Sequence, residues 1–249
     1  HNFNRRITVQ SDGNNILIFD ADDGNIFYFR PTGGAYYPDD RSGDTSYVIK
    51  NADGTFTRTL KNGTVETYNP AGKLTSITER NGRTTTLTYS GNDLASITDA
   101  AGRTTNINNS AGKITAITNP AGQTYTLAYL GGMLSSLTDP AGNIWRFTYD
   151  GNGHMLTKKD PANNTVTYTY DAQGRVLTST DPEGKTRTMS YGAGNITTFT
   201  EKDGGVWTYK YDPVLVVIIE KTDPLGNVTS YQYDEKRNPT GYKSDLQVY

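Results

Sequence analysis

The chain has 249 residues, of which only 34% are apolar, and it contains 18 Tyr and 26 Gly, a composition that suits β-sheets with hydrated faces better than a thick aliphatic core. A net charge of -2 without clustered Lys and Arg argues against nucleic acid as a partner, and the lack of cysteine excludes disulfides, thiolate catalysis and Cys-type zinc sites. The longest apolar run, residues 214–219, is far shorter than the roughly 20 residues of a membrane-spanning helix, so no membrane span is expected.

Residues 1–60 predict a divergent β-rich capping module that starts the rest of the chain. Apolar segments at residues 16–19, 26–29 and 47–49 alternate with turn signals at residues 11–13, 22–24 and 52–54. Terminal units of repeat proteins are usually atypical, which fits a capping role for this module. Since the sequence begins at His1 without a basic and apolar leader, we expect any export signal to lie upstream.

Residues 61–249 are organised by a repeat of 20–22 residues. A first series of nine positions holds tyrosine at eight, namely Tyr68, Tyr89, Tyr129, Tyr149, Tyr170, Tyr191, Tyr211 and Tyr233, with Asn109 as the exception. Between them lie Asp-Pro-x-Gly or Asn-Pro-x-Gly cassettes at residues 119–122, 139–142, 181–184 and 223–226. Proline presets a type I turn, the preceding Asp or Asn bonds to the turn amides, and glycine accepts the closing position. A second turn follows each tyrosine, so each repeat has room for two strands of about six residues.

Side chains between the turns alternate with period two. Trp145, Phe147 and Tyr149 share one face, while Arg146 and Thr148 fall on the other. We therefore expect an all-β fold of tandem antiparallel hairpins, with almost no helix, in one curled or spiral sheet. The repeated tyrosines are expected to form a structural ladder along one face of that sheet.

The repeat resembles a known family at its most regular point. Tyr-Asp-Ala-Gln-Gly-Arg at residues 170–175, followed by Asp-Pro-Glu-Gly at residues 181–184, is similar to the RHS (rearrangement hotspot) or YD repeat. Residues 53–83 are similar to the segment that leads into such arrays, and residues 1–4 to the module before it. Asn109 in place of tyrosine, Gly192 after Tyr191, and Leu215 in place of a turn glycine depart from the pattern.

The resemblance implies a function without a catalytic centre. The family includes shell components of insecticidal toxin complexes, polymorphic toxins and the animal teneurins, and its repeats wind a β-sheet strip into a hollow shell that can enclose a toxic domain. This implies a wall segment, or partial RHS shell, of a large secreted or cell-surface bacterial protein. Its partners would be the remainder of that protein or an enclosed cargo domain. The family's self-cleaving core segment has no counterpart before Tyr249.

No catalytic, cofactor or metal site is expected from the residues themselves. The two histidines are His1 at the terminus and His154 in a predicted turn, where an exposed turn residue is favoured over a functional one. Most aspartates occupy the first position of turns, where local backbone bonding explains them. Residues 20–25 superficially resemble a calcium loop, but Gly24, Asn25 and Pro31 stand at its fifth, sixth and twelfth positions, which favours a tight turn.

Two alternatives stay open at this level. Sugars stack on exposed aromatic rings, so a surface carbohydrate-binding or adhesion module would use the aromatic face, although packing of that face is favoured. Residues 214–219 predict a strand that is apolar on both faces, which could contact missing chain or another copy, as in a subunit of an extracellular self-assembling fibre. The candidate stacking residues are Trp145, Trp207, Tyr149, Tyr170 and Tyr209.

Overall fold

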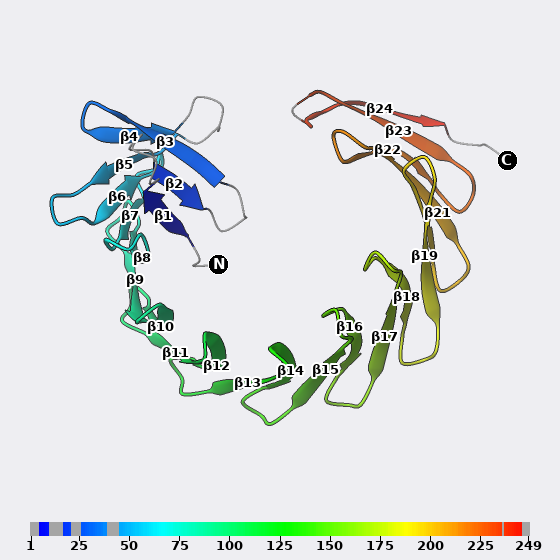
Figure 1. The fold of residues 1–249 in the computed structure, drawn as a ribbon, viewed down its shortest axis with the longest axis horizontal. Coiled ribbons are helices and arrows are strands. Elements are labelled where there is room, and N and C mark those ends of the chain that lie inside the picture. Colours follow the sequence, from blue (N-terminus) through cyan, green and yellow to red (C-terminus); the bar gives the residue numbers. More distant parts are fainter. Residues whose placement is uncertain (1–4, 10–16, 21–25, 39–44, 236, 246–249) are drawn as a thin grey trace. The chain divides into compact units, whose positions relative to one another are not determined.

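The structure, a computed structural model, describes residues 5–9, 17–20, 26–38, 45–235 and 237–245 (Figure 1). These residues form 24 strands of one antiparallel sheet, and they contain no helix. The all-β hairpin architecture expected from the sequence is therefore confirmed. The turn signals at residues 11–13 and 22–24, the segment 1–4, and residues 21–25 of the calcium-like stretch lie outside the described residues.

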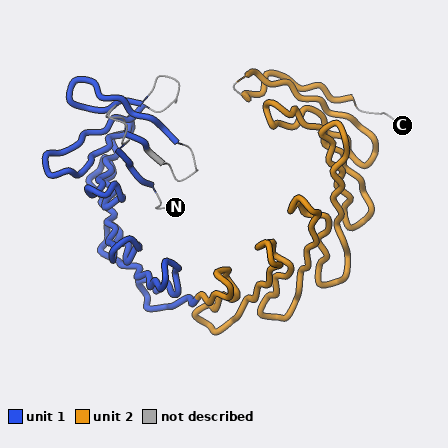
Figure 2. Tube along the Cα trace, in the orientation of Figure 1, with its two compact units in different colours: residues 1–126 blue, residues 127–249 orange. Residues whose placement is uncertain are grey.

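The chain divides into two compact units, residues 1–126 and 127–249 (Figure 2). The first unit holds β1 (Arg6–Val9), β2 (Leu17–Asp20), β3 (Ile26–Thr32), β4 (Ala35–Pro38), β5 (Tyr47–Lys50), β6 (Phe56–Thr59), β7 (Val65–Tyr68), β8 (Leu74–Thr78), β9 (Thr84–Ser90), β10 (Asp93–Thr98), β11 (Thr104–Ser110) and β12 (Lys113–Thr118). Strand β13 (Thr124–Leu130) crosses the boundary. The second unit holds β14 (Met133–Thr138), β15 (Ile144–Tyr149), β16 (Met155–Lys159), β17 (Thr165–Tyr170), β18 (Val176–Thr180), β19 (Thr186–Gly192), β20 (Ile196–Thr200), β21 (Val206–Asp212), β22 (Val217–Thr222), β23 (Val228–Tyr233) and β24 (Pro239–Asp245).

The nine repeat positions all fall near the C-terminal end of an odd-numbered strand, from Tyr68 in β7 to Tyr233 in β23. Each repeat thus supplies two strands, as the spacing of the turn signals predicts. The described residues of the apolar segments predicted before residue 60 are also strands, since 17–19 lie in β2, 26–29 in β3 and 47–49 in β5.

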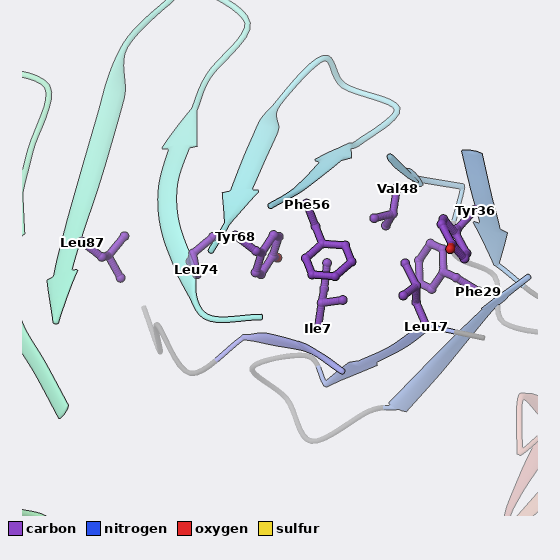
Figure 3. Close-up of a cluster of buried hydrophobic side chains, with 9 residues drawn as sticks. All are labelled: Ile7, Leu17, Phe29, Tyr36, Val48, Phe56, Tyr68, Leu74 and Leu87. Atoms are coloured by element: carbon purple, nitrogen blue, oxygen red, sulfur yellow. The ribbon is translucent and has the colours of Figure 1, made fainter. Parts of the chain in front are cut away.

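The apolar core lies in the first unit, and it takes one side chain from each of its first nine strands (Figure 3). The cluster comprises Ile7, Leu17, Phe29, Tyr36, Val48, Phe56, Tyr68, Leu74 and Leu87. Strand β1 also returns to the start of β8, because the Ile7 amide donates to the Gly72 carbonyl at 2.9 Å and Arg6 forms a bridge with Lys73. The cluster draws on strands from both sides of residue 60, so the predicted domain boundary there stays a prediction.

Burial falls along the chain. No described residue after Ile107 is buried. In the second unit, strands such as β15, β17 and β19 alternate between half-buried and exposed side chains, whereas β14, β18, β20 and β22 are half-buried throughout. A sheet with no fully buried side chain is a single layer rather than one half of a sandwich. The second unit follows a curved path in Figure 2, in line with the expected curl.

Turns that begin with Asp share one geometry, both in the cassettes and after Tyr170. In the Asp-Pro-Ala-Gly turn the Gly142 amide donates to the Asp139 carbonyl at 3.0 Å, and Gly142 has a φ of 85°. The Asp139 carboxylate accepts the amides of Ala141 and Asn143 at 2.9 and 2.8 Å, and its other oxygen accepts the Asn143 side-chain amide at 2.8 Å. In the turn after Tyr170, Asp171 receives the equivalent three bonds from Gln173 and Arg175. These carboxylates close the loop, which is the role predicted for them.

The prediction of one strand over residues 214–219 is wrong. Residues 213–216 form a turn, and β22 begins at Val217. The cause is Asp212, whose carboxylate accepts the amides of Val214 and Leu215 at 2.8 Å each. With no glycine available, the left-handed conformation falls on Val216, which has a φ of 54°.

Candidate functional site

The repeated tyrosines lie where neighbouring repeats separate. Strands β16 and β17 pair at three positions, from Lys159–Thr165 to Thr157–Thr167. Met155 lies beyond the Thr157–Thr167 pair, where β17 no longer pairs with β16. The Tyr170 hydroxyl donates to the Met155 carbonyl at 2.8 Å. A backbone acceptor that lies beyond the β16–β17 ladder is thereby satisfied by a side chain of the next repeat.

The same bond recurs at a fixed separation of 15 residues. The Tyr89 hydroxyl donates to the Leu74 carbonyl, and the Tyr191 hydroxyl to the Val176 carbonyl, both at 2.8 Å. At the exceptional position, the Asn109 side-chain amide donates to the Leu94 carbonyl, also at 2.8 Å. Asparagine therefore keeps the hydrogen bond of the series but not the volume of the ring.

A second contact covers several of these rings from the preceding repeat. The Lys73 ammonium lies 5.2 Å from the centre of the Tyr89 ring, and the Arg175 guanidinium lies 4.1 Å from that of Tyr191. In the equivalent place His154 stacks on Tyr170, with ring centres 4.9 Å apart, and its Nδ1 lies 2.9 Å from the Asp150 carboxylate. Cations and planar side chains are favourable over an aromatic face, so these contacts tie one repeat to the next.

The structure places the predicted ladder and stacking residues on strands but does not test what they bind. Outside β7, where Tyr68 is buried, the tyrosines of the series are half-buried. Trp145, Trp207 and Tyr209 are also half-buried, and the Lys221 ammonium lies 4.2 Å from the centre of the Trp207 ring. Sugar stacking on Trp145, Trp207, Tyr149, Tyr170 or Tyr209 remains a prediction.

The sequence patterns missed a buried polar network in the first unit. Glu66 is fully buried and forms an ion pair with Arg5, while its other oxygen accepts Arg58 at 3.0 Å and the Tyr68 hydroxyl at 2.7 Å. Arg58 also donates to the Ser46 hydroxyl at 2.8 Å. Burial, and then the charge of Glu66, raise the pKa of Tyr68. The partners lie up to 61 residues apart, which local patterns could not reveal.

Within the described ranges, no three His, Cys, Asp or Glu side chains gather as a metal site. Across the same ranges, no helix has the length and hydropathy needed to cross a membrane.

One family model matches most of the chain, and a solved structure shares its fold. The family model described as Teneurin YD-shell matches residues 4–238. The crystal structure of TcdB2-TccC3 is 16% identical and covers 94% of this chain with a TM-score of 0.53, which supports the same fold. The Photorhabdus luminescens Tc holotoxin pore is 15% identical, covers 96% of the chain and gives a TM-score of 0.47. This chain spans 16% and 18% of those two chains. No curated protein matches it in sequence.

Proposed function

The chain belongs to the Teneurin YD-shell family, and from this membership we propose that it is a non-catalytic wall segment of a larger secreted bacterial protein that encloses or presents another domain. Function then resides in the curvature and continuity of the sheet. Its partners are the remainder of the parent polypeptide and the domain held against the wall.

The observation that carries this proposal is the hydrogen bond between repeats. A tyrosine or asparagine side chain bonds the preceding repeat at four junctions, always 15 residues back. Such a bond joins neighbours without needing a core beneath the sheet, which suits a thin wall. The aspartates of the turns, the most abundant candidate acids, are occupied as loop-closing acceptors.

The test is protection of the neighbouring domain in the complete polypeptide. We expect a domain encoded next to this segment to resist protease in the intact protein. We also expect it to become sensitive when Tyr170→Ala and Tyr191→Ala open two junctions of the wall. Tyr125→Ala removes an exposed ring outside the series and is the matched control. A neighbouring domain that is cut as fast in the intact protein as in isolation would contradict enclosure.

The same material discriminates the two alternatives. Selective glycan binding that is lost with Trp145→Ala or Trp207→Ala would favour a carbohydrate-binding module. Filaments in electron micrographs of the purified protein would favour a fibre subunit.

A further inference from the structure

The junction between β16 and β17 differs from its equivalents in the side chain that covers the tyrosine of the next repeat. Lys73 and Arg175 lie over the equivalent rings, and both keep their charge throughout the neutral pH range. Here the covering side chain is His154, the only histidine of the described residues, which stacks on Tyr170. Because histidine changes its charge between about pH 5 and 8, a charge that is permanent at those two junctions is conditional at this one.

The His154 ring is held between the turns of two successive repeats. Its Nδ1 lies 2.9 Å from one carboxylate oxygen of Asp150, and the other oxygen accepts the His154 amide at 2.9 Å. The ring centres of His154 and Tyr170 lie 4.9 Å apart, with 24° between the planes. The ring also packs closely on the next turn, since a Cβ on Gly174 would lie 2.5 Å from Nε2. The side chain is 31% exposed, so water screens these contacts incompletely.

We propose that His154 is a pH-sensitive switch that tightens the junction between β16 and β17 when its ring is protonated. Imidazolium forms a charge-assisted hydrogen bond with the Asp150 carboxylate and a cation–π contact with the Tyr170 ring, whereas neutral imidazole forms neither. The first contact fixes the ring on its own turn, and the second joins it to the next repeat. The junction is therefore tightest at mildly acidic pH and loosens as the pH rises toward 8.

The groups that face the ring are compatible with a positive charge on it. On its own turn, the side-chain hydrogen bond with His154 is the largest cause that holds the pKa of Asp150 below the ordinary value of 3.8, so this carboxylate stays ionised at mildly acidic pH. On β17, desolvation is the main cause that raises the pKa of Tyr170, so the phenol stays neutral. On the next turn, Asp171 and Arg175 form an ion pair at 2.7 Å and offset each other.

Hydrogen exchange of the full chain, followed by NMR at single amides, tests the switch. After correction for the intrinsic exchange rate at each pH, protection of the β16–β17 ladder should be about two- to fivefold higher near pH 5.5 than near pH 8. The change should follow the NMR titration of the His154 ring. The β18–β19 ladder is the control within the same molecule, because Arg175 covers Tyr191 there, and its protection should not change.

Two variants fix the charge at either extreme. His154→Arg supplies the permanent cation of the equivalent position and should keep the high protection at both pH values. His154→Gln is neutral and should show the low protection at both. Equal protection of the wild-type β16–β17 ladder at the two pH values, a pH dependence that persists in His154→Gln, or the same change in the β18–β19 ladder would overturn the proposal. None of these results bears on the wall function, which is tested by protection of a neighbouring domain.

Discussion

At the scale of the residue, the tyrosine of each repeat does more than supply an apolar ring. Its hydroxyl completes the hydrogen bonding of a carbonyl that the separating strands leave behind, as Tyr191 does for Val176. Asn109 keeps the same bond, to the Leu94 carbonyl, without an aromatic ring. The need to satisfy this carbonyl, and not ring stacking alone, therefore restricts which residues fit the repeat position. A side-chain donor is required at the Val176 carbonyl because the backbone pairing between β18 and β19 has ended before it.

Tyr191→Phe measures the contribution of the tyrosine hydroxyl to stability. It keeps the ring under Arg175 but leaves the Val176 carbonyl without its donor, which should lower the free energy of unfolding by about 1 kcal/mol. Chemical denaturation followed by tryptophan fluorescence measures the change. Tyr125→Phe, at a 42% exposed position, should leave stability within about 0.5 kcal/mol. Equal effects of the two changes would show that the carbonyl bond does not contribute.

The turn aspartates make stability depend on acid pH. Hydrogen bonds from the Asn143 side chain, and then from the backbone, hold the pKa of Asp139 below its ordinary value of 3.8. A pKa that is lowered in the folded chain adds stability that is fully present above the ordinary value of 3.8. This stability is lost as the pH falls through the pKa of the folded chain. Asp139→Asn should therefore be less stable than the wild type at pH 7, and the difference should shrink once the pH falls below 3.8 and vanish below the folded pKa. Thermal melts across this range measure it.

Asn119 provides the reverse experiment. It closes its turn with the same two backbone bonds, from Ala121 and Gln123, but it has no charge to titrate. Asn119→Asp should gain stability at neutral pH and lose that gain in acid. Melting temperatures of Asp139→Asn and Asn119→Asp that run parallel to the wild type at every pH would refute the titration argument.

At the scale of the element, closure of β1 onto β8 depends on a single glycine. A Cβ on Gly72 would lie 1.6 Å from the Ile7 carbonyl oxygen, and the residue has a φ of 76°. Both the close approach and the backbone conformation require glycine at this point.

Gly72→Ala should therefore cost about 3 kcal/mol or more and release β1 from the Gly72–Lys73 segment. Gly82→Ala is the control, because Gly82 has a similar φ of 83° but open space around it, so only the backbone cost of about 1–2 kcal/mol applies. Hydrogen exchange of the Ile7 amide reports the closure directly. Equal costs at the two glycines would mean that β1 is not held there.

A glycine substitution in the turn before β22 should raise stability, whereas the substitutions of Gly72 and Gly82 lower it. Val216 is a β-branched residue at a φ of 54°, so Val216→Gly should stabilise the chain by about 1 kcal/mol. Val214 belongs to the same turn, is 81% exposed and lacks a positive φ, so Val214→Gly should give no gain. Urea unfolding of both variants checks the contrast.

The sequence predicted elements well wherever the information is local. Strand alternation and the Asp-Pro-x-Gly or Asn-Pro-x-Gly cassettes placed the hairpins, because a cassette turn is closed by a side-chain oxygen that bonds within four residues, as Asp139 and Asn119 show. The turn at Val216 was missed because an apolar run masks the control exerted by Asp212. The bond from Tyr170 to Met155 and the pairing of Arg5 with Glu66 depend on register and on contacts across many residues, which periodicity does not encode.

At the scale of the whole molecule, buried side chains are confined to the N-terminal part of the described chain. They run from Ile7 to Ile107, and they include the buried network around Glu66. Local stability should follow this distribution, because slow opening requires buried apolar contacts.

Hydrogen exchange measured by mass spectrometry tests this gradient. We expect the slowest exchange in β7 and β8, where Tyr68 and Leu74 are completely buried. Strands of the second unit, such as β17 and β18, should exchange faster although their ladder bonds are equivalent. Uniform protection along the chain would show that the ladder alone sets local stability.

The short junction between repeats also has an evolutionary consequence. Strands β16 and β17, like β18 and β19, meet through three residue pairs and a tyrosine side-chain bond. A duplicated or deleted segment of one period therefore recreates the same junction on either side. Unequal recombination within the gene can then lengthen or shorten the protein in whole steps, with no compensating substitutions elsewhere.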